Sequence, residues 1–216
     1  HPWRKGLIFD INEAIQNETP FLIDNQEVIS LILRGQEYEN QTKGYFNPAI
    51  GKLVSLWGFH SEVPRKLMPD TKAILKLVES KPSMGNIEII NNELRSTNKF
   101  VQIDMGGYAK GYALDQAKNI LEQNKISNAL INIGGNILAL GMQGDEEWVV
   151  GIQDPRNPNL MASLPLKPGW SIGTSGDYQK YFTVNEKRYS HIINPHKGYP
   201  VSNTKSVTIL MPPGNN

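Results

Sequence analysis

Phe100-Val-Gln-Ile-Asp-Met-Gly-Gly-Tyr-Ala-Lys-Gly-Tyr-Ala-Leu-Asp115 is the stretch from which the rest of the chain is best understood. Its alternation of apolar and polar residues from Phe100 to Met105 predicts a half-buried strand. Gly106 and Gly107 follow, where a chain can turn sharply or let a ligand approach the main chain. A helical pattern then begins, and its predicted apolar face consists of Ala109, Tyr112, Ala113, Ala117, Ile120 and Leu121.

The predicted strand, glycine turn and helix start together favour an anion site. Free main-chain N–H groups and the positive end of the helix dipole meet at such a turn. Lys110 adds a positive charge one turn into the helix, and Asp104 comes just before the turn. The pattern matches neither the P-loop nor Gly-x-Gly-x-x-Gly, so an ordinary strand-to-helix connection stays open as the alternative.

Composition narrows the class of protein. Of 216 residues, 39% are hydrophobic and 20% are charged, which is typical of a globular chain. The formal net charge of +1 does not suggest a nucleic-acid partner. The absence of cysteine excludes disulfides, thiolate metal ligands and cysteine nucleophiles. The sequence contains neither a membrane-span-length apolar run nor a signal peptide, and because it begins with His1 we expect a processed or trimmed piece.

Several further elements are predicted from caps, periodicity and turn residues. The predicted helices are Asp24–Asn40, capped by Asp24 or Asn25, and Pro69–Ser80, while Ile8–Ile15 fits either a short strand or a helical turn. The predicted strands are Ile87–Ile90 and Glu93–Ser96 around an Asn91-Asn92 turn, Ala129–Gly141 interrupted at Gly134-Gly135, Trp148–Gln153 and Ser206–Met211. We expect a bulge or a bound ligand at the interrupting glycines, and a loop over Asp154–Pro168. Without an internal repeat or linker, the sequence predicts one α+β domain over residues 1–216.

Aromatic and histidine residues supply further candidates. Tyr45, Phe46 and Asn47 could stack on and hydrogen-bond a flat heterocycle, whereas Trp57 and Phe59 are expected to be buried. His191 fits either a packed residue or a proton carrier, and His196 is expected to be structural. As a third possibility for His191, it could pair with Ser175 in a hydrolase, although Gly-Thr-Ser-Gly is not the Gly-x-Ser-x-Gly elbow. No histidine spacing indicates zinc, and Asp104 could hold magnesium beside a phosphate.

Five ordered stretches resemble one family, the bacterial FAD:protein FMN transferases, also called ApbE-type flavin transferases. The stretches are Gly44-Tyr-Phe-Asn-Pro-Ala-Ile-Gly-Lys-Leu-Val-Ser-Leu-Trp-Gly-Phe59, Ile103-Asp-Met-Gly-Gly-Tyr-Ala-Lys-Gly-Tyr-Ala-Leu-Asp115, Asn132-Ile-Gly-Gly-Asn136, Thr174-Ser-Gly-Asp-Tyr-Gln-Lys-Tyr-Phe182, and His191-Ile-Ile-Asn-Pro195 with Gly198-Tyr-Pro200.

The resemblance implies an α+β fold with FAD in a cleft. It also implies magnesium-dependent transfer of FMN from FAD to a threonine of a partner protein, with release of AMP. Some members hydrolyse FAD instead. The residues that the resemblance places at the site are Tyr45, Phe46 and Asn47 along the flavin nucleotide, Asp104, Lys110 and Ile193 against FAD, Gly107 with its carbonyl on magnesium, and His191 in proton transfer.

The resemblance has consequences for partners and for the chain ends. It implies an extracytoplasmic, periplasmic location, a membrane anchor only in a preceding segment, and an acceptor such as a subunit of a membrane redox complex. Family members have an early Met-Gly-Thr-like strand, and beyond the last strand an Asp followed four residues later by Thr. We expect a chain without these ends to hold magnesium weakly and to transfer flavin poorly. The alternatives are an FAD pyrophosphatase and an FAD-binding protein without catalysis.

Overall fold

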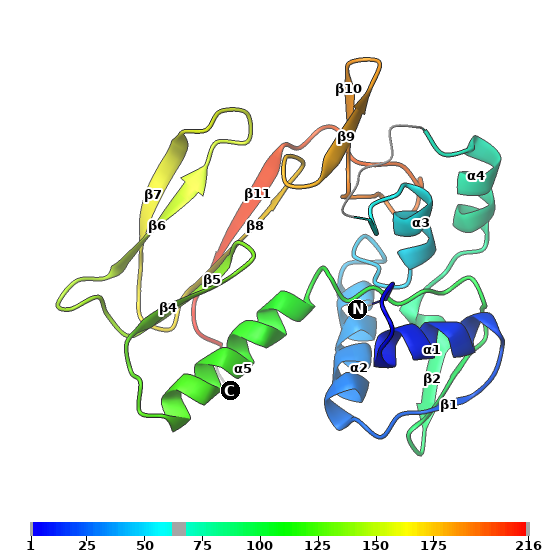
Figure 1. The fold of residues 1–216 in the computed structure, drawn as a ribbon, viewed down its shortest axis with the longest axis horizontal. Coiled ribbons are helices and arrows are strands. Elements are labelled where there is room, and N and C mark those ends of the chain that lie inside the picture. The colour runs from blue at the N-terminus through cyan, green and yellow to red at the C-terminus, as the bar shows by residue number, and fades with distance from the viewer. Residues whose placement is uncertain (1, 62–67, 215–216) are drawn as a thin grey trace. The chain divides into compact units, whose positions relative to one another are not determined.

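The computed structural model describes residues 2–61 and 68–214, which contain both helices and sheets (Figure 1). The α+β prediction is therefore confirmed. The chain separates into two compact units. Unit 1 comprises the chain up to Gly107 together with Lys180–Ser202, and unit 2 comprises Tyr108–Gln179 together with the chain from Asn203. A single family domain over residues 1–216 stays a prediction.

Unit 1 combines short helices with two small antiparallel sheets. Its elements are α1 Leu7–Gln16, β1 Phe21–Leu22, α2 Gln26–Gln41, α3 Gly51–Leu56, α4 Thr71–Glu79, the 3-10 helix Met84–Asn86, β2 Ile87–Ile90, β3 Glu93–Ser96, β9 Tyr181–Val184 and β10 Lys187–Ser190. One sheet has the order β1-β3-β2, and β9 pairs with β10 in the other.

The predicted helices and hairpin of unit 1 are confirmed. Asn25 caps α2, because its side-chain oxygen accepts a hydrogen bond from the N–H of Val28 at 3.0 Å. Asp70 caps α4 in the same way. The β2–β3 turn places Asn91 and Asn92 at φ 51° and 65°, in the left-handed region that asparagine tolerates better than most residues.

The core of unit 1 gathers around α3 and the β9–β10 hairpin. A buried cluster holds Leu53, Trp57, Phe59, Ile74, Phe182 and Ile193. The predicted burial of Trp57 and Phe59 is confirmed. The indole N–H of Trp57 donates to the carbonyl of Gly198 at 2.8 Å, so this core also holds the loop that follows β10.

The predicted strand over Phe100–Met105 is only half right. Val101, Ile103 and Met105 are buried in alternation, as predicted. The prediction of a regular strand is wrong, because within the described residues this segment forms one isolated bridge, between Gln102 and Ile50. The reason is that the segment's second side is bonded by the side chain of Asn12 and not by another strand.

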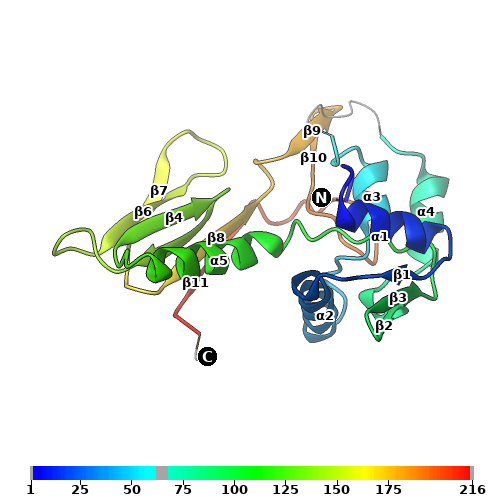
Figure 2. The ribbon, with the colours of Figure 1, turned by 60° about the horizontal axis from the view of Figure 1, so that its bottom comes forward.

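Unit 2 is a sheet covered on both faces. Its elements are α5 Ala109–Gln123, β4 Ala129–Ile133, β5 Asn136–Leu140, β6 Trp148–Gln153, β7 Leu160–Leu166, β8 Ser171–Gly176 and β11 Ser206–Met211. The antiparallel sheet has the order β11-β8-β5-β4. Leu114 of α5 packs against Leu138 and Leu140, whereas Val150 and Leu166 of the β6–β7 hairpin pack with Ala139 and Ile172 from the opposite face (Figure 2).

Three expectations for unit 2 need correction. Gly134 and Gly135, at φ 56° and 89°, form the turn of the β4–β5 hairpin and not a bulge, because two consecutive left-handed residues reverse the chain. Part of the expected Asp154–Pro168 loop is strand β7, since it completes a hairpin with β6. Ile120 is 58% exposed, and Leu114 is the buried residue of α5.

Strand β11 is confirmed and lies at one end of its sheet. It pairs with β8 from Ser206 to Met211. Val207, Ile209 and Met211 share the face that α5 covers over β4 and β5, yet they remain 50%, 56% and 54% exposed. No helix in the described part of the chain is long and apolar enough to cross a membrane.

Candidate functional site

The loop after α2 in unit 1 brings an aromatic ring against the glycine turn. The ring of Phe46 lies edge-on to Tyr38, with ring centroids 6.1 Å apart. The ring also lies against Gly107, where an added Cβ would stand 2.8 Å from the ring atom Cε2. Glycine is therefore needed at position 107 for this approach. Two of the predicted site residues, far apart in sequence, are in direct contact.

Tyr45 and Asn47, on either side of Phe46, differ in their surroundings. Tyr45 is 68% exposed, and its ring meets His196 edge-on at 4.9 Å. The side chain of Asn47 donates to the carbonyl of Pro82 and accepts from the N–H of Ala49, both at 2.8 Å. Asn47 therefore fixes the loop from within, while Tyr45 presents an open aromatic surface.

Asp104 shapes the turn that precedes the helix α5. Its carboxylate accepts a hydrogen bond from the N–H of Gly106 at 2.9 Å. Burial raises the pKa of Asp104 above its usual range, and this hydrogen bond and the nearby positive charge of Lys180 oppose the rise. The carboxylate thus lies in a partly desolvated position that retains a cationic neighbour in Lys180.

His191 follows β10 and is held on one side of its ring. The main-chain N–H of His191 donates to the carbonyl of Lys180 at 3.0 Å. The ring atom Nδ1 lies 3.1 Å from the same carbonyl oxygen. Because a carbonyl can only accept, the hydrogen bond requires a proton on Nδ1, and in the neutral ring the lone pair is then on Nε2. Phe59 packs edge-on against the ring at 6.4 Å. This arrangement suits an oriented proton acceptor.

Ile193 lies two residues further on, in the core of unit 1. Only 8% of the residue is exposed, and its side chain packs in the cluster around Trp57. A single bridge to Pro200 closes the loop that contains it. Its predicted contact with FAD stays a prediction.

Lys110 belongs to unit 2 and contacts the glycine turn at Gly134-Gly135. From the first turn of α5, its Nζ donates to the carbonyl of Gly134 at 3.3 Å. The N–H of Gly135 in the same turn donates to the side chain of Asn132 at 3.0 Å. The cation is thus placed beside an ordered glycine turn, a proximity that the sequence reasoning did not predict.

An ion pair in unit 2 was missed from the sequence. Arg156 donates from Nη1 and Nη2 to the two carboxylate oxygens of Asp177, at 2.7 and 2.6 Å. Asp177 is only 6% exposed, and its N–H donates to the carbonyl of Lys205. The pair fixes the Asp154–Pro158 region to the end of β8. The sequence pointed to Asp177 through the Thr174-Ser-Gly-Asp stretch, but no residue near Arg156 in the sequence indicated its partner.

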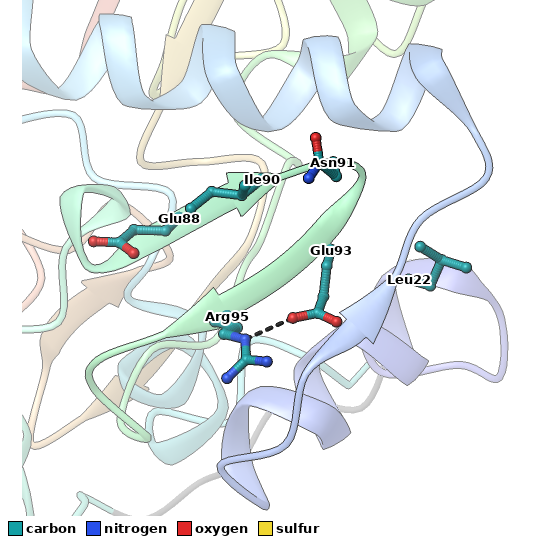
Figure 3. A pocket seen from close by; sticks show the side chains of 6 residues that line it. All are labelled: Leu22, Glu88, Ile90, Asn91, Glu93 and Arg95. Carbon is teal, nitrogen blue, oxygen red and sulfur yellow. Dashed lines mark hydrogen bonds and ion pairs between the residues drawn. The ribbon is translucent and has the colours of Figure 1, made fainter.

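A cavity of about 310 Å³ lies elsewhere in unit 1, beside the β1-β3-β2 sheet. Figure 3 shows its lining side chains on β1 and the β2–β3 hairpin: Leu22, Glu88, Ile90, Asn91, Glu93 and Arg95. Leu22 and Ile90 are more than 60% exposed, and Arg95 is paired with Glu93 at 2.6 Å. None of the predicted site residues lines it. We favour the Phe46–Gly107 region, where titratable, aromatic and glycine residues meet.

Candidate metal ligands are few. Across residues 2–61 and 68–214, no group of three or more histidine, aspartate, glutamate or cysteine side chains is placed to hold a metal. Gly107 is exposed and offers a carbonyl oxygen, and Asp104 offers carboxylate oxygens three residues earlier. Hard oxygen donors of this kind suit magnesium, but here they are too few to form a complete cage.

The alternative Ser175–His191 pairing stays a prediction, because its two residues belong to different units. Ser175 is exposed on β8 in unit 2, opposite Val207 of β11, whereas His191 belongs to unit 1.

Comparisons with known proteins agree with each other. The model of the ApbE family matches residues 1–215. A protein of Rhodobacter capsulatus named FAD:protein FMN transferase is 35% identical over 210 residues, covering 97% of this chain and 40% of its own length. A protein of the same name from Klebsiella pneumoniae (strain 342) is 34% identical over 212 residues, covering 95% of this chain and 63% of its own.

Solved structures show the same likeness. The ApbE protein of Thermotoga maritima superposes with a TM-score of 0.84 at 32% identity, covering 93% of this chain and 65% of that one. The chain therefore spans about half the length of the curated relatives it matches and about two thirds of this solved structure.

Proposed function

Because the chain belongs to the ApbE family, we propose that the protein transfers FMN from FAD to a threonine side chain of a partner protein and releases AMP. The observation that carries this proposal is the contact between Phe46 and Gly107, three residues after the partly buried Asp104. An aromatic ring beside a main-chain turn is suited to a ligand that joins a flat ring system to phosphates.

The aromatic loop would bind the flavin nucleotide. Tyr45 offers an exposed ring for stacking, and Phe46 packs against Tyr38 and Gly107. Asn47 keeps the loop in place through its two hydrogen bonds. A preformed aromatic surface lowers the ordering cost of binding.

The charged residues would act on the pyrophosphate. Lys110 supplies a cation at the start of α5, where main-chain N–H groups also favour an anion. Magnesium, when bound, would neutralise negative charge on the pyrophosphate, and in this chain the Gly107 carbonyl and the Asp104 carboxylate are the oxygen donors that fit it.

The proton of the threonine hydroxyl needs an acceptor. In the proposed reaction the hydroxyl oxygen bonds to the phosphorus nearer riboflavin, the bond from that phosphorus to the bridging oxygen breaks, and AMP leaves with that oxygen. His191 fits the acceptor, because its Nδ1–H is engaged by Lys180 and Nε2 carries the lone pair.

Partner and location rest on the family resemblance. We propose a flavin-acceptor protein, such as a subunit of a membrane redox complex, and an extracytoplasmic site of action. Two curated relatives are named FAD:protein FMN transferase, and this name supports a protein as the acceptor.

The test is incubation of the protein with FAD, magnesium chloride and a threonine-containing acceptor protein. Chromatography measures AMP, and mass spectrometry measures FMN bound to the acceptor. Equal amounts of AMP and flavinylated acceptor are expected. AMP without flavinylated acceptor would indicate an FAD pyrophosphatase, and FAD binding without AMP would indicate a binding protein. A protein that does not bind FAD would refute the proposal.

A further inference from the structure

The helix α1 contributes a buried amide, Asn12, to the interior of unit 1. Asn12 is only 7% exposed, although its carboxamide is polar. Its Nδ2 donates to the carbonyl of Ile103 at 3.0 Å, and its Oδ1 accepts from the N–H of Ile103 at 2.7 Å. One side chain therefore satisfies both main-chain groups of a single residue, as a hydrogen-bonded neighbour does in an antiparallel sheet.

The other side of the same segment is held by a different part of unit 1. Gln102 donates to the carbonyl of Ala49 at 3.0 Å, and Asp104 donates to that of Pro48 at 2.8 Å. The segment is thus bonded on one side by the end of the aromatic loop and on the other side by Asn12. Without Asn12, Ile103 would leave a buried N–H and a buried carbonyl unpaired.

We propose that Asn12 is a positioning residue, which acts through Ile103 to hold the Asp104–Gly107 turn against the aromatic loop in the arrangement that binds the pyrophosphate end of FAD. This inference rests on the proposed function. The ring of Phe46 fits against Gly107 only while the turn keeps its place, and the Asp104 carboxylate is oriented by its main chain and by Gly106. Asn12 acts at one remove, because it bonds Ile103, the residue before Asp104.

The first test measures FAD affinity of Asn12→Ala by fluorescence quenching, against a matched control. Gln36→Ala also deletes two hydrogen bonds from a helical amide, to the carbonyls of Met84 and Ile87, elsewhere in unit 1. We expect FAD to bind at least tenfold more weakly to Asn12→Ala and within twofold of the parent to Gln36→Ala. Equal effects of the two substitutions would overturn the proposal, because they would show a general loss of stability.

The second test needs no ligand. Hydrogen exchange followed by NMR compares the amide of Asp104, which bonds Pro48, with that of Trp57, which bonds Leu53 in the core. In Asn12→Ala the Asp104 amide should exchange at least tenfold faster, and the Trp57 amide should change much less. An unchanged Asp104 amide would overturn the proposal, as would faster exchange with unchanged FAD affinity.

The tests still decide the proposal if Asn12→Ala does not fold or if the parent protein does not bind FAD. If Asn12→Ala does not fold, Asn12→Asp replaces it under the same criteria, because it keeps the volume and the oxygen that accepts from Ile103 but loses the donor at neutral pH. If the parent protein binds no FAD, the proposed function fails, and the exchange of the Asp104 amide still decides whether Asn12 holds the turn.

Discussion

Replacing Gly107 with alanine should disturb the aromatic loop and ligand binding together. The new Cβ would stand 2.8 Å from Cε2 and 3.2 Å from Cζ of Phe46. Ordinary carbon contacts lie at about 3.5–4.0 Å, so the ring or the turn must move by roughly 1 Å. Overpacking of this kind costs about 1–3 kcal/mol. For a chain of this length, a loss of about 2 kcal/mol lowers the melting temperature by roughly 4–8 °C.

The assay combines thermal unfolding with titration of FAD. Gly111→Ala is the control, because a Cβ at Gly111 meets no atom within 4 Å and lies inside α5. There alanine should stabilise the helix by about 0.5–1 kcal/mol and leave FAD affinity unchanged. In a Phe46→Ala background, Gly107→Ala should cost far less. If it costs the same with and without the ring, the steric reasoning is refuted.

Three further predictions concern charged groups. Burial raises the pKa of Asp104 in the folded protein, so the ionised carboxylate lowers the stability at neutral pH. This loss of stability disappears as the pH falls through the raised pKa and then below the ordinary value of about 3.9. Asp104→Asn should therefore raise the urea midpoint at pH 7 but not at pH 3, and equal midpoints at pH 7 would contradict this. Lys110→Met should weaken FAD binding by about 1.5–3 kcal/mol in fluorescence titrations at moderate salt, because it removes a charge-assisted contact. The circular dichroism of the helices should not change. An FAD affinity equal to that of the parent would exclude the pyrophosphate role. Arg156→Ala should lower the free energy of unfolding by about 3 kcal/mol in urea, since it removes the ion pair that compensates the largely buried Asp177 carboxylate, and Arg156→Ala with Asp177→Asn should recover part of the loss. A single variant as stable as the parent would contradict the last prediction.

Elements with local signals were predicted well. The cap predicted at Asp24 or Asn25, the asparagine turn at Asn91-Asn92 and the strand Ser206–Met211 depend on residues close to one another in sequence. The segment Phe100–Met105 shows where local signals end. Its burial pattern was correct, but its partner is a side chain on a helix 91 residues away, which no window of sequence reveals.

The candidate site divides in the same way. Local residues identified the Asp104–Gly107 turn and the Tyr45–Asn47 loop, but their contact through Phe46 is tertiary and follows from folding alone. Pairing of Arg156 with Asp177 is likewise set by the β6–β7 hairpin and the end of β8. The individual roles at the site came from the resemblance to a family and stay predictions.

Strand β11 has a practical consequence for handling this protein. A strand at the end of a sheet presents main-chain groups to which another extended chain can bond, and Val207, Ile209 and Met211 give it an apolar face. Proteins usually protect such edges with charge or proline, and here Lys205 and Pro212 flank the strand without interrupting it. Solutions of this chain should therefore self-associate as concentration rises, so its ligand titrations belong in the low micromolar range, with light scattering recorded alongside.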